Sequence, residues 1–267
     1  MSEFSDNVVV ITGASEGIGR ALAMALAPQG PKLVLAARNV ARLDSLAAEC
    51  EAVGAKVLTV PADLTDEVQC RALVEATVAR FGRLDTLVAN AGRTMWAPVE
   101  AIRDQAVVRD VMELNYFSVV WLTLAALPHL KAARGRIVPV ASVAGLTGVP
   151  SRSAYCASKH AVIGFFDSLR IELAGSGVSV TLICPDFVLS EIHRRALDGE
   201  GRPLGSSPMQ EEKIMTAEQC AALMIPAMAA RKRLLITSKR GRLGRFLKVF
   251  APGLIDRIAA KAIADRK

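Results

Sequence analysis

Short apolar runs alternate with longer amphipathic segments along most of this chain. The runs lack the apolar–polar alternation of a strand that has one face in water. A strand buried on both faces belongs in a parallel sheet that is covered by helices on either side. The runs predict strands at residues 8–12, 32–37, 56–60, 84–89, 135–142, 178–184 and 234–237.

The segments between these runs have helical periodicity. They predict helices near residues 17–27, 40–52, 66–81, 105–127, 153–174 and 216–230. A repeated strand–helix–strand order with right-handed crossovers gives a doubly wound, or Rossmann, α/β sheet. We therefore expect a single-domain parallel sheet of about seven strands over residues 1–240, which suits a chain of 267 residues that is 52% hydrophobic.

Residues 185–215, which follow the sixth predicted strand, depart from this alternation of strands and helices. The segment is rich in Pro, Gly, Ser and charged residues. A connection of this length in a compact domain is usually functional or disordered. Ligands of doubly wound sheets bind outside the carboxyl ends of the strands, where this segment begins. We expect it to form a lid over a substrate.

The basic character of the chain lies at its C-terminal end. The net charge is +7, but residues 231–267 hold 12 Lys and Arg against 2 Asp and Glu, so residues 1–230 are slightly acidic. Within residues 241–267, apolar side chains recur at helical spacing beside the basic ones. A basic amphipathic segment can lie in an anionic membrane interface, or it can pack on its own domain or on a partner subunit. Nucleic acid is the least favoured partner.

The remaining composition limits the function further. The five cysteines, at 50, 70, 156, 184 and 220, are scattered and have neither CxxC nor His spacing, so we expect no metal site and a reduced, cytoplasmic location. No run of 18 uninterrupted apolar residues is present, and we expect no membrane span. Association with a membrane would then be peripheral, through residues 241–267.

A glycine-rich turn joins the first predicted strand to the first predicted helix. Gly13, Gly17 and Gly19 are spaced G-x-x-x-G-x-G, and Ser15 and Ile18 lie between them. Glycines permit a tight turn and a close approach of the backbone to a ligand, and a helix N-terminus offers free N–H groups to a pyrophosphate. The turn therefore predicts a dinucleotide-binding site.

Arg38 follows the second predicted strand, where an acidic residue would bind the ribose hydroxyls of NAD. A guanidinium can instead pair with the 2′-phosphate of NADP. Glu16 in the glycine-rich turn would oppose that phosphate. We expect NADP(H) to be preferred over NAD(H), with the latter left open.

Tyr155 and Lys159 are four residues apart in a predicted helix and therefore share one face. An ammonium beside a phenol favours the phenolate, so Tyr155 can pass a proton to or from a substrate oxygen. Ser142, at the end of the fifth predicted strand, can hydrogen-bond the same oxygen. These three side chains are the predicted catalytic group.

Together these motifs resemble the classical short-chain dehydrogenase/reductase family. The resemblance rests on Tyr155-x-x-x-Lys159, Ser142, Asn115, the Asn90-Ala91-Gly92 segment and the glycine-rich turn, and extends over residues 7 to about 237. It implies that Asn115 binds a water linking the lysine to solvent. It also implies that Tyr155 and Lys159 contact the nicotinamide ribose, that Asp63 binds the adenine, and that Asn90 is largely structural.

The chain departs from the family after the sixth predicted strand, where Pro-Gly is common and Pro185-Asp186 stands here. Val188 still suits a backbone contact to the carboxamide of the cofactor, and Ser190 stands where the family often has threonine. Asp186 either caps a helix or lies at the surface, or it recognises an amine or hydroxyl of the substrate.

The resemblance implies an NADP(H)-dependent oxidoreductase that interconverts a ketone and a secondary alcohol, and that forms a homodimer or homotetramer. The C-terminal segment looks like that of members acting on lipids, sterols or sphingoid ketones, which favours a hydrophobic substrate. The alternative is a dinucleotide-binding regulatory or scaffold protein without turnover.

Overall fold

A six-stranded parallel sheet forms the centre of the molecule in a computed structural model, which describes residues 3–209, 212 and 214–264. Its strand order is β3-β2-β1-β4-β5-β6. The strands are β1 (Val8–Thr12), β2 (Lys32–Ala37), β3 (Lys56–Pro61), β4 (Thr86–Ala89), β5 (Arg136–Pro139) and β6 (Ser179–Val180). The order reverses between β1 and β4, which is the doubly wound topology predicted from the sequence.

The sixth predicted strand is interrupted. It consists of β6 and β7 (Leu182–Cys184), and β7 pairs in parallel with β8 (Leu234–Ile236) in a separate two-stranded sheet. At the break, the backbone N–H of Thr181 still donates to the Ile137 carbonyl at 2.9 Å, and Val140 bridges Ile183. The prediction of about seven strands in one sheet thus differs in count but not in arrangement.

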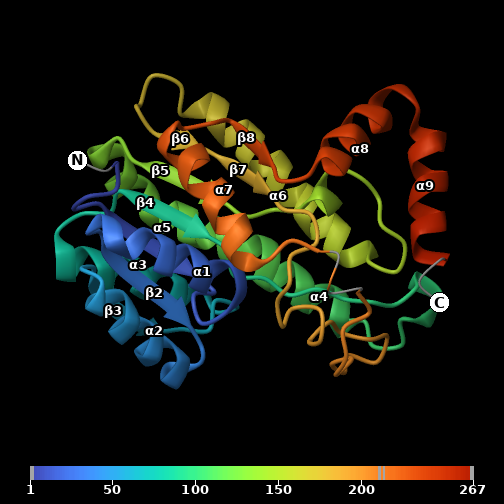
Figure 1. The fold of residues 1–267 in the computed structure, drawn as a ribbon, viewed down its shortest axis with the longest axis horizontal. Helices are drawn as coiled ribbons and strands as arrows, with labels where there is room; N and C mark the ends of the chain where they lie inside the picture. Colours follow the sequence, from blue (N-terminus) through green and yellow to red (C-terminus); the bar gives the residue numbers. More distant parts are fainter. Residues whose placement is uncertain (1–2, 210–211, 213, 265–267) are drawn as a thin grey trace.

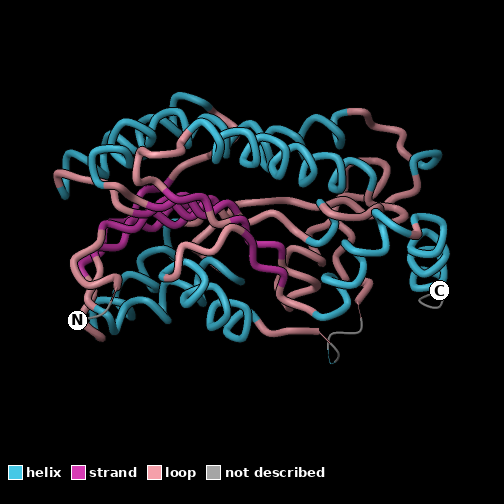
Figure 2. Tube along the Cα trace, turned by 90° about the horizontal axis from the view of Figure 1, so that it is seen from above, coloured by secondary structure: helices cyan, strands magenta, loops and turns pink. Residues whose placement is uncertain are grey.

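Helices cover both faces of the sheet, as Figures 1 and 2 show. One face carries α1 (Gly17–Leu26), α2 (Val40–Ala52) and α7 (Ala217–Ala229), and the other carries α3 (Glu67–Phe81), α5 (Ser118–Ala133) and α6 (Ser153–Glu172). Successive residues of β1 point to opposite faces, so Val9 and Ile11 enter the first core and Val8 and Val10 the second. Burial on both faces explains the continuously apolar strands.

The predicted helix over 105–127 is longer and irregular. It begins as α4 (Ala106–Met112), passes through a π-helical turn, η3 (Glu113–Phe117), and continues in α5 beyond Pro128 to Ala133. By length and composition alone, residues 106–133 could cross a membrane. In this fold the helix packs against α3 and β4, with Leu122 and Leu130 fully buried.

The C-terminal segment forms two helices, α8 (Lys239–Phe250) and α9 (Pro252–Ala264), at the end of the molecule far from the N-terminus (Figure 1). Three 3₁₀ turns complete the described elements: η1 (Ala27–Gln29), η2 (Val99–Ala101) and η4 (Val143–Gly145). The described part of residues 185–215 carries isolated β-bridges, of which one joins Met95 to Leu197. Residues 210, 211 and 213 of the predicted lid and 265–267 of the predicted tail lie outside the described residues.

Candidate functional site

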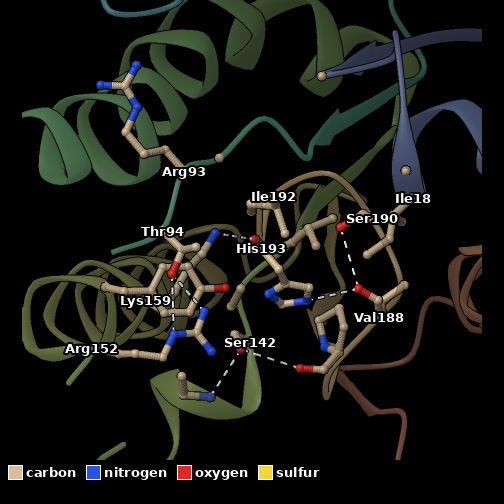
Figure 3. Close-up of a pocket in the computed structure, with 18 of the residues that line it drawn as sticks. Ile18, Arg93, Thr94, Ser142, Arg152, Lys159, Val188, Ser190, Ile192 and His193 are labelled. Carbon is tan, nitrogen blue, oxygen red and sulfur yellow. Dashed lines mark hydrogen bonds between the residues drawn. The ribbon is translucent and has the colours of Figure 1, made fainter. Parts of the chain in front are cut away.

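A cavity of about 840 Å³ opens at the carboxyl ends of the strands. The glycine-rich turn lines one part of it, and the loops after β2, β3 and β4 line its continuation. The far part is lined by Ser142, Tyr155 and Lys159, by the segment after β7, and by residues of α8 and α9. Figure 3 shows Ser142, Arg152 and Lys159 on one side of this space and Val188 and Ser190 on the other.

The glycine-rich turn has the backbone geometry that a pyrophosphate site requires. Gly13 and Gly17 have φ angles of +63° and +54°, which favour glycine. A Cβ on Gly19 would overlap the Gly13 carbonyl oxygen, so only glycine fits there. The N-terminus of α1 has no side-chain cap, whereas Asn39 and Asp66 cap α2 and α3. The uncapped N–H groups of α1 face the cavity beside Ser15 and Ile18 and suit a pyrophosphate.

Asn90 fixes this turn from the neighbouring strand. Its side-chain Nδ2 donates to the carbonyl oxygens of Thr12 and Gly13 at 2.9 and 3.3 Å, and its backbone N–H donates to Thr12 Oγ1 at 2.9 Å. The Asn90 side chain therefore holds the glycine-rich turn in its conformation, which is a structural role.

Arg38 lies at the end of β2 and lines the cavity. Among the described residues, no carboxylate lies within ion-pair distance of it. Glu16, which would repel a phosphate, is paired with Arg42 at 2.5 Å and with Arg195 at 2.8 Å. The charge expected to oppose a 2′-phosphate is thus largely compensated.

Asp63 lines the cavity near Arg38. Its carboxylate accepts hydrogen bonds from the backbone N–H of Thr65 at 3.0 Å and from the Thr65 hydroxyl at 2.8 Å. The Thr65 N–H lowers the pKa of Asp63, although partial burial opposes this. A fixed, ionised acceptor of this kind suits the exocyclic amine of an adenine.

Ser142, Tyr155 and Lys159 come together on one wall of the cavity. Ser142 Oγ accepts from the Ala144 N–H at 3.1 Å and faces the Pro185 carbonyl at 3.4 Å. Lys159 Nζ donates to the Val140 carbonyl at 2.9 Å and lies 5.8 Å from the centre of the Tyr155 ring. A hydroxyl, a phenol and a fixed cation therefore converge where one substrate oxygen could bind.

Asn115 lies in the π-helical turn η3, a form of helix that often marks functional sites. Its Nδ2 donates to the Arg93 carbonyl and to Ser158 Oγ, both at 2.9 Å, and its Oδ1 accepts from the Arg93 N–H at 2.8 Å. These bonds tie the loop after β4 to α6. The structure shows no direct bond from Asn115 to Lys159, and the water relay implied by the resemblance stays a prediction.

Val188 and Ser190 line the cavity opposite the catalytic group (Figure 3). His193 contacts the Val188 carbonyl through Nε2 at 3.1 Å, and Ser190 lies against Gly17, where an added Cβ would come within 3.1 Å of the Ser190 Cβ. Of the apolar residues in the predicted lid, Phe187, Ile192 and Leu197 line the cavity, whereas Leu189, Leu204 and Met209 are absent from its lining.

Asp186 anchors the C-terminal helices. Its carboxylate accepts hydrogen bonds from Ser238 Oγ at 2.6 Å and from Arg240 Nη2 at 2.7 Å, and Ser238 caps α8. Burial by itself raises the pKa of Asp186, but the bonds from Arg240 and Ser238 outweigh it and lower the pKa. The carboxylate is thereby occupied by the chain itself, although it caps neither α7 nor α8, whose N-caps are Thr216 and Ser238.

Arg152 is the site residue that the sequence analysis missed. It lies at the start of α6, lines the cavity, and places its guanidinium carbon 4.2 Å from the centre of the Tyr155 ring. Its position three residues before Tyr155, at the predicted start of the helix, is the signal that could have identified it.

Burial lowers the pKa of Lys159 to about 8; the Cys184 thiol opposes this effect and the Arg152 charge adds to it. The ordinary lysine pKa of 10.5 applies to the unfolded chain. Below about pH 8 both states hold the proton, and folding must bury the charge. Between about pH 8 and 10.5 the unfolded state binds more protons, so stability from this group rises with pH.

Lys159→Met should therefore raise the free energy of unfolding at neutral pH by about 1–2 kcal/mol, because the buried charge is removed. The gain should shrink as the pH approaches about 10. Urea denaturation without cofactor measures both values. Lys131→Met, on the exposed side of α5, is the matched control and should change stability by less than about 0.5 kcal/mol. A Lys159→Met protein less stable than wild type at every pH would contradict the account.

Comparisons with known proteins identify the family. The short chain dehydrogenase family model matches residues 7–201. The chain is 41% identical to human dehydrogenase/reductase SDR family member 7, over 85% of this chain and 68% of that protein. It is 36% identical to 11-beta-hydroxysteroid dehydrogenase 1A of Arabidopsis thaliana, over 95% of this chain and 75% of that protein.

A solved structure shares the fold as well. A short-chain dehydrogenase/reductase from Burkholderia phymatum in complex with NAD aligns with a TM-score of 0.83 at 30% identity, covering 95% of this chain and 96% of that one. The chain belongs to the short-chain dehydrogenase/reductase family, whose members bind an NAD(P) dinucleotide, and it is an oxidoreductase acting on CH–OH groups.

Proposed function

We propose that this protein is an NADP(H)-dependent oxidoreductase that interconverts a ketone and a secondary alcohol on a hydrophobic, steroid- or lipid-like substrate, with Tyr155 as the acid/base. The observation that carries the proposal is the single cavity that contains both the glycine-rich turn and the Ser142, Tyr155 and Lys159 group. A dinucleotide held at the turn would extend toward a carbonyl held at the other end.

The reaction divides between the cofactor and the chain. When bound, the dinucleotide supplies or accepts a hydride at the carbonyl carbon. Ser142 Oγ and the Tyr155 hydroxyl donate hydrogen bonds to the carbonyl oxygen and fix its position. In the direction of reduction, the Tyr155 proton moves to that oxygen as its negative charge develops, and a phenolate is left. In oxidation the phenolate takes the proton back.

Lys159 stabilises the phenolate that each reduction leaves on Tyr155. Its ammonium is buried and held by the Val140 carbonyl, so its distance from the phenol is fixed. Asn115 supports this arrangement by tying the loop after β4 to Ser158, next to Lys159 in α6. The cofactor contacts of Tyr155, Lys159, Asp63, Val188 and Ser190 are part of the same proposal.

The substrate end of the cavity is apolar on several sides. Phe187, Ile192 and Leu197 line it from the segment after β7, and Ile255 and Ile258 line it from α9. Apolar walls with a few fixed polar groups are typical of sites for large hydrophobic ligands. The plant relative named an 11-beta-hydroxysteroid dehydrogenase supports a steroid-like ketone.

Tyr155→Phe tests the mechanism. NADPH supplied with a panel of steroidal and long-chain ketones should be turned over by wild type, and the variant should lose about 100- to 10,000-fold in kcat because the acid is gone. NADPH binding, followed by tryptophan fluorescence, should persist. Full turnover by Tyr155→Phe would refute the role of Tyr155. Tight NADPH binding without turnover of any carbonyl would favour the regulatory or scaffold alternative.

Arg38→Asp tests the cofactor preference. Arg38 has no carboxylate partner among the described residues, and Glu16 is neutralised by Arg42 and Arg195, so a 2′-phosphate suits this corner. The variant should raise the KM for NADPH by about 10- to 100-fold, because a charge-assisted pair is lost. The KM for NADH should stay the same or fall. Arg71→Asp on α3 is the control. An unchanged ratio of the two KM values would refute the assignment.

We also propose that α8 and α9 form a peripheral contact with an anionic membrane surface. Their inner side is held to the domain by Asp186–Arg240 and by a 2.9 Å bond between Lys248 and His160. Their outer side exposes Leu243, Phe246, Val249 and Phe250 among basic residues. Apolar side chains ringed by cations suit the interface of a bilayer with anionic headgroups.

Sedimentation with vesicles checks this contact. Wild type should sediment with vesicles rich in anionic phospholipid and much less with neutral ones, and Phe246→Glu combined with Phe250→Glu should remove binding. Val68→Glu, an exposed apolar position on α3, is the control. If the double variant sediments as wild type does, the helices are not a membrane contact.

Self-association completes the proposal. Exposed apolar residues on α5 and α6, including Leu124 and Ile171, support a homodimer or homotetramer formed through these helices.

A further inference from the structure

Arg152 is a buried cation that has no part in the reaction proposed above. Its side chain is 4% exposed, and its Nη2 and Nε donate to Thr94 Oγ1 at 2.7 and 3.3 Å. The acceptor of both bonds is a neutral hydroxyl, which does not offset the charge. Figure 3 shows the guanidinium between Thr94 and Ser142.

Three aromatic rings surround this cation. The guanidinium carbon lies 4.2 Å from the centre of the Tyr155 ring and 5.7 Å from those of Trp96 and Phe187. Burial lowers the pKa of Arg152, whereas the charge and the hydroxyl of Tyr155 raise it. An arginine nevertheless keeps its proton throughout the working range of an enzyme.

A buried guanidinium without a carboxylate carries a desolvation cost that an anion must offset. Among the described residues, no Asp or Glu lies within ion-pair distance of Arg152. A group beside it that can become an anion is Tyr155, whose ring the guanidinium overlies.

We propose that Arg152 is a second cation that, together with Lys159, holds Tyr155 as a phenolate. The phenolate left after each reduction would lie beside two positive charges, one from the N-cap residue of α6 and one from within the helix. Both cations lie beside the same ring, since the Arg152 guanidinium carbon is 4.2 Å and Lys159 Nζ is 5.8 Å from the centre of the Tyr155 ring.

Two cations can stabilise the phenolate over a wider range of pH than Lys159 can alone. Lys159 loses its proton at about pH 8 in this dry site, whereas Arg152 does not. Above that pH, Arg152 is the charge that remains beside the phenol. The structure thus assigns to Arg152 the stabilisation of the Tyr155 phenolate at alkaline pH.

The other charged or titratable groups around Tyr155 do not replace this charge. Burial raises the pKa of the Cys184 thiol, at the end of β7, to about 12, and it also raises the pKa of the Cys156 thiol, so both stay neutral in the working range. On the opposite walls, Asp186 is paired with Arg240 of α8, and Asp110 of α4 is paired with Arg93. His193 lies beside Phe187, with its Nε2 on the Val188 carbonyl.

The chain permits a direct measurement because Tyr116 and Tyr155 are its only tyrosines. In a Tyr116→Phe background, the ultraviolet absorbance of tyrosinate reports Tyr155 alone, and Tyr155→Phe supplies the blank. The titration is made on the cofactor-free full chain with Arg152, Arg152→Lys and Arg152→Met. Circular dichroism at each pH confirms that each protein is folded.

The phenolate of Tyr155 should appear at a pH higher by about one unit or more in Arg152→Met than with Arg152, and Arg152→Lys should restore most of the difference. Thr94→Val, which keeps the charge but removes its anchor, should produce a smaller shift in the same direction and serves if Arg152→Met does not fold. Equal midpoints with and without the charge at position 152 would overturn the proposal.

The pH profile of alcohol oxidation gives a second readout, which rests on the proposed function. Oxidation of the best neutral secondary alcohol of the panel needs the phenolate, so its rise with pH should shift upward in Arg152→Met by the amount seen in the titration. An unchanged profile, with a raised KM only for ketones that carry a carboxylate, would instead assign Arg152 to the substrate. The titration needs no turnover, so a failure of the proposed function is distinguishable from a failure of this inference.

Discussion

Burial of the sheet on both faces is the constraint on which the rest of the structure depends. Helices cover β1, β2 and β4 above and below, so neither face can carry a polar site. The edges at the carboxyl ends are the remaining place where loops can present polar side chains. Asn90 bonds the loop after β4 to the turn after β1 across this edge, and Asn115 bonds it to α6. The cofactor end and the catalytic end are thereby held in one rigid frame.

The charges along the cavity follow a common pattern. Glu16, Asp110 and Asp186, three of its lining carboxylates, are each paired with arginine side chains. Arg38, Arg152 and Lys159 have no such partner among the described residues. Unpaired cations in a partly dry cavity favour the anions that the proposed function would place there, a phosphate at one end and a phenolate at the other. The protein thus has a positive cavity although residues 1–230 are slightly acidic.

The periodicity of apolar residues predicted much of the fold. The pattern of buried positions in a strand or helix can be seen in the residues of that segment alone. The predicted bounds of β1, β2 and α2 agree with the structure to the residue. The predicted helix over 105–127 ends just before Pro128, yet α5 continues through Pro128 to Ala133, with Leu130 fully buried beyond the proline. The pairing of Glu16 with Arg195 joins residues 179 apart, and the docking of Arg240 on Asp186 joins residues 54 apart. Spacing along the sequence does not predict contacts between residues so far apart. The neutralisation of Glu16 and the role of Asp186 could therefore be seen only in the structure.

The central claim is that one cavity delivers a hydride from one end and a proton from the other to a single carbonyl group. The most direct test is to supply NADPH deuterated at its transferable position with a ketone that the enzyme accepts, in ordinary water, and to analyse the alcohol by mass spectrometry and NMR. One deuterium should appear on the carbinol carbon, because the hydride comes from the cofactor. An alcohol without deuterium at that carbon would contradict the central claim.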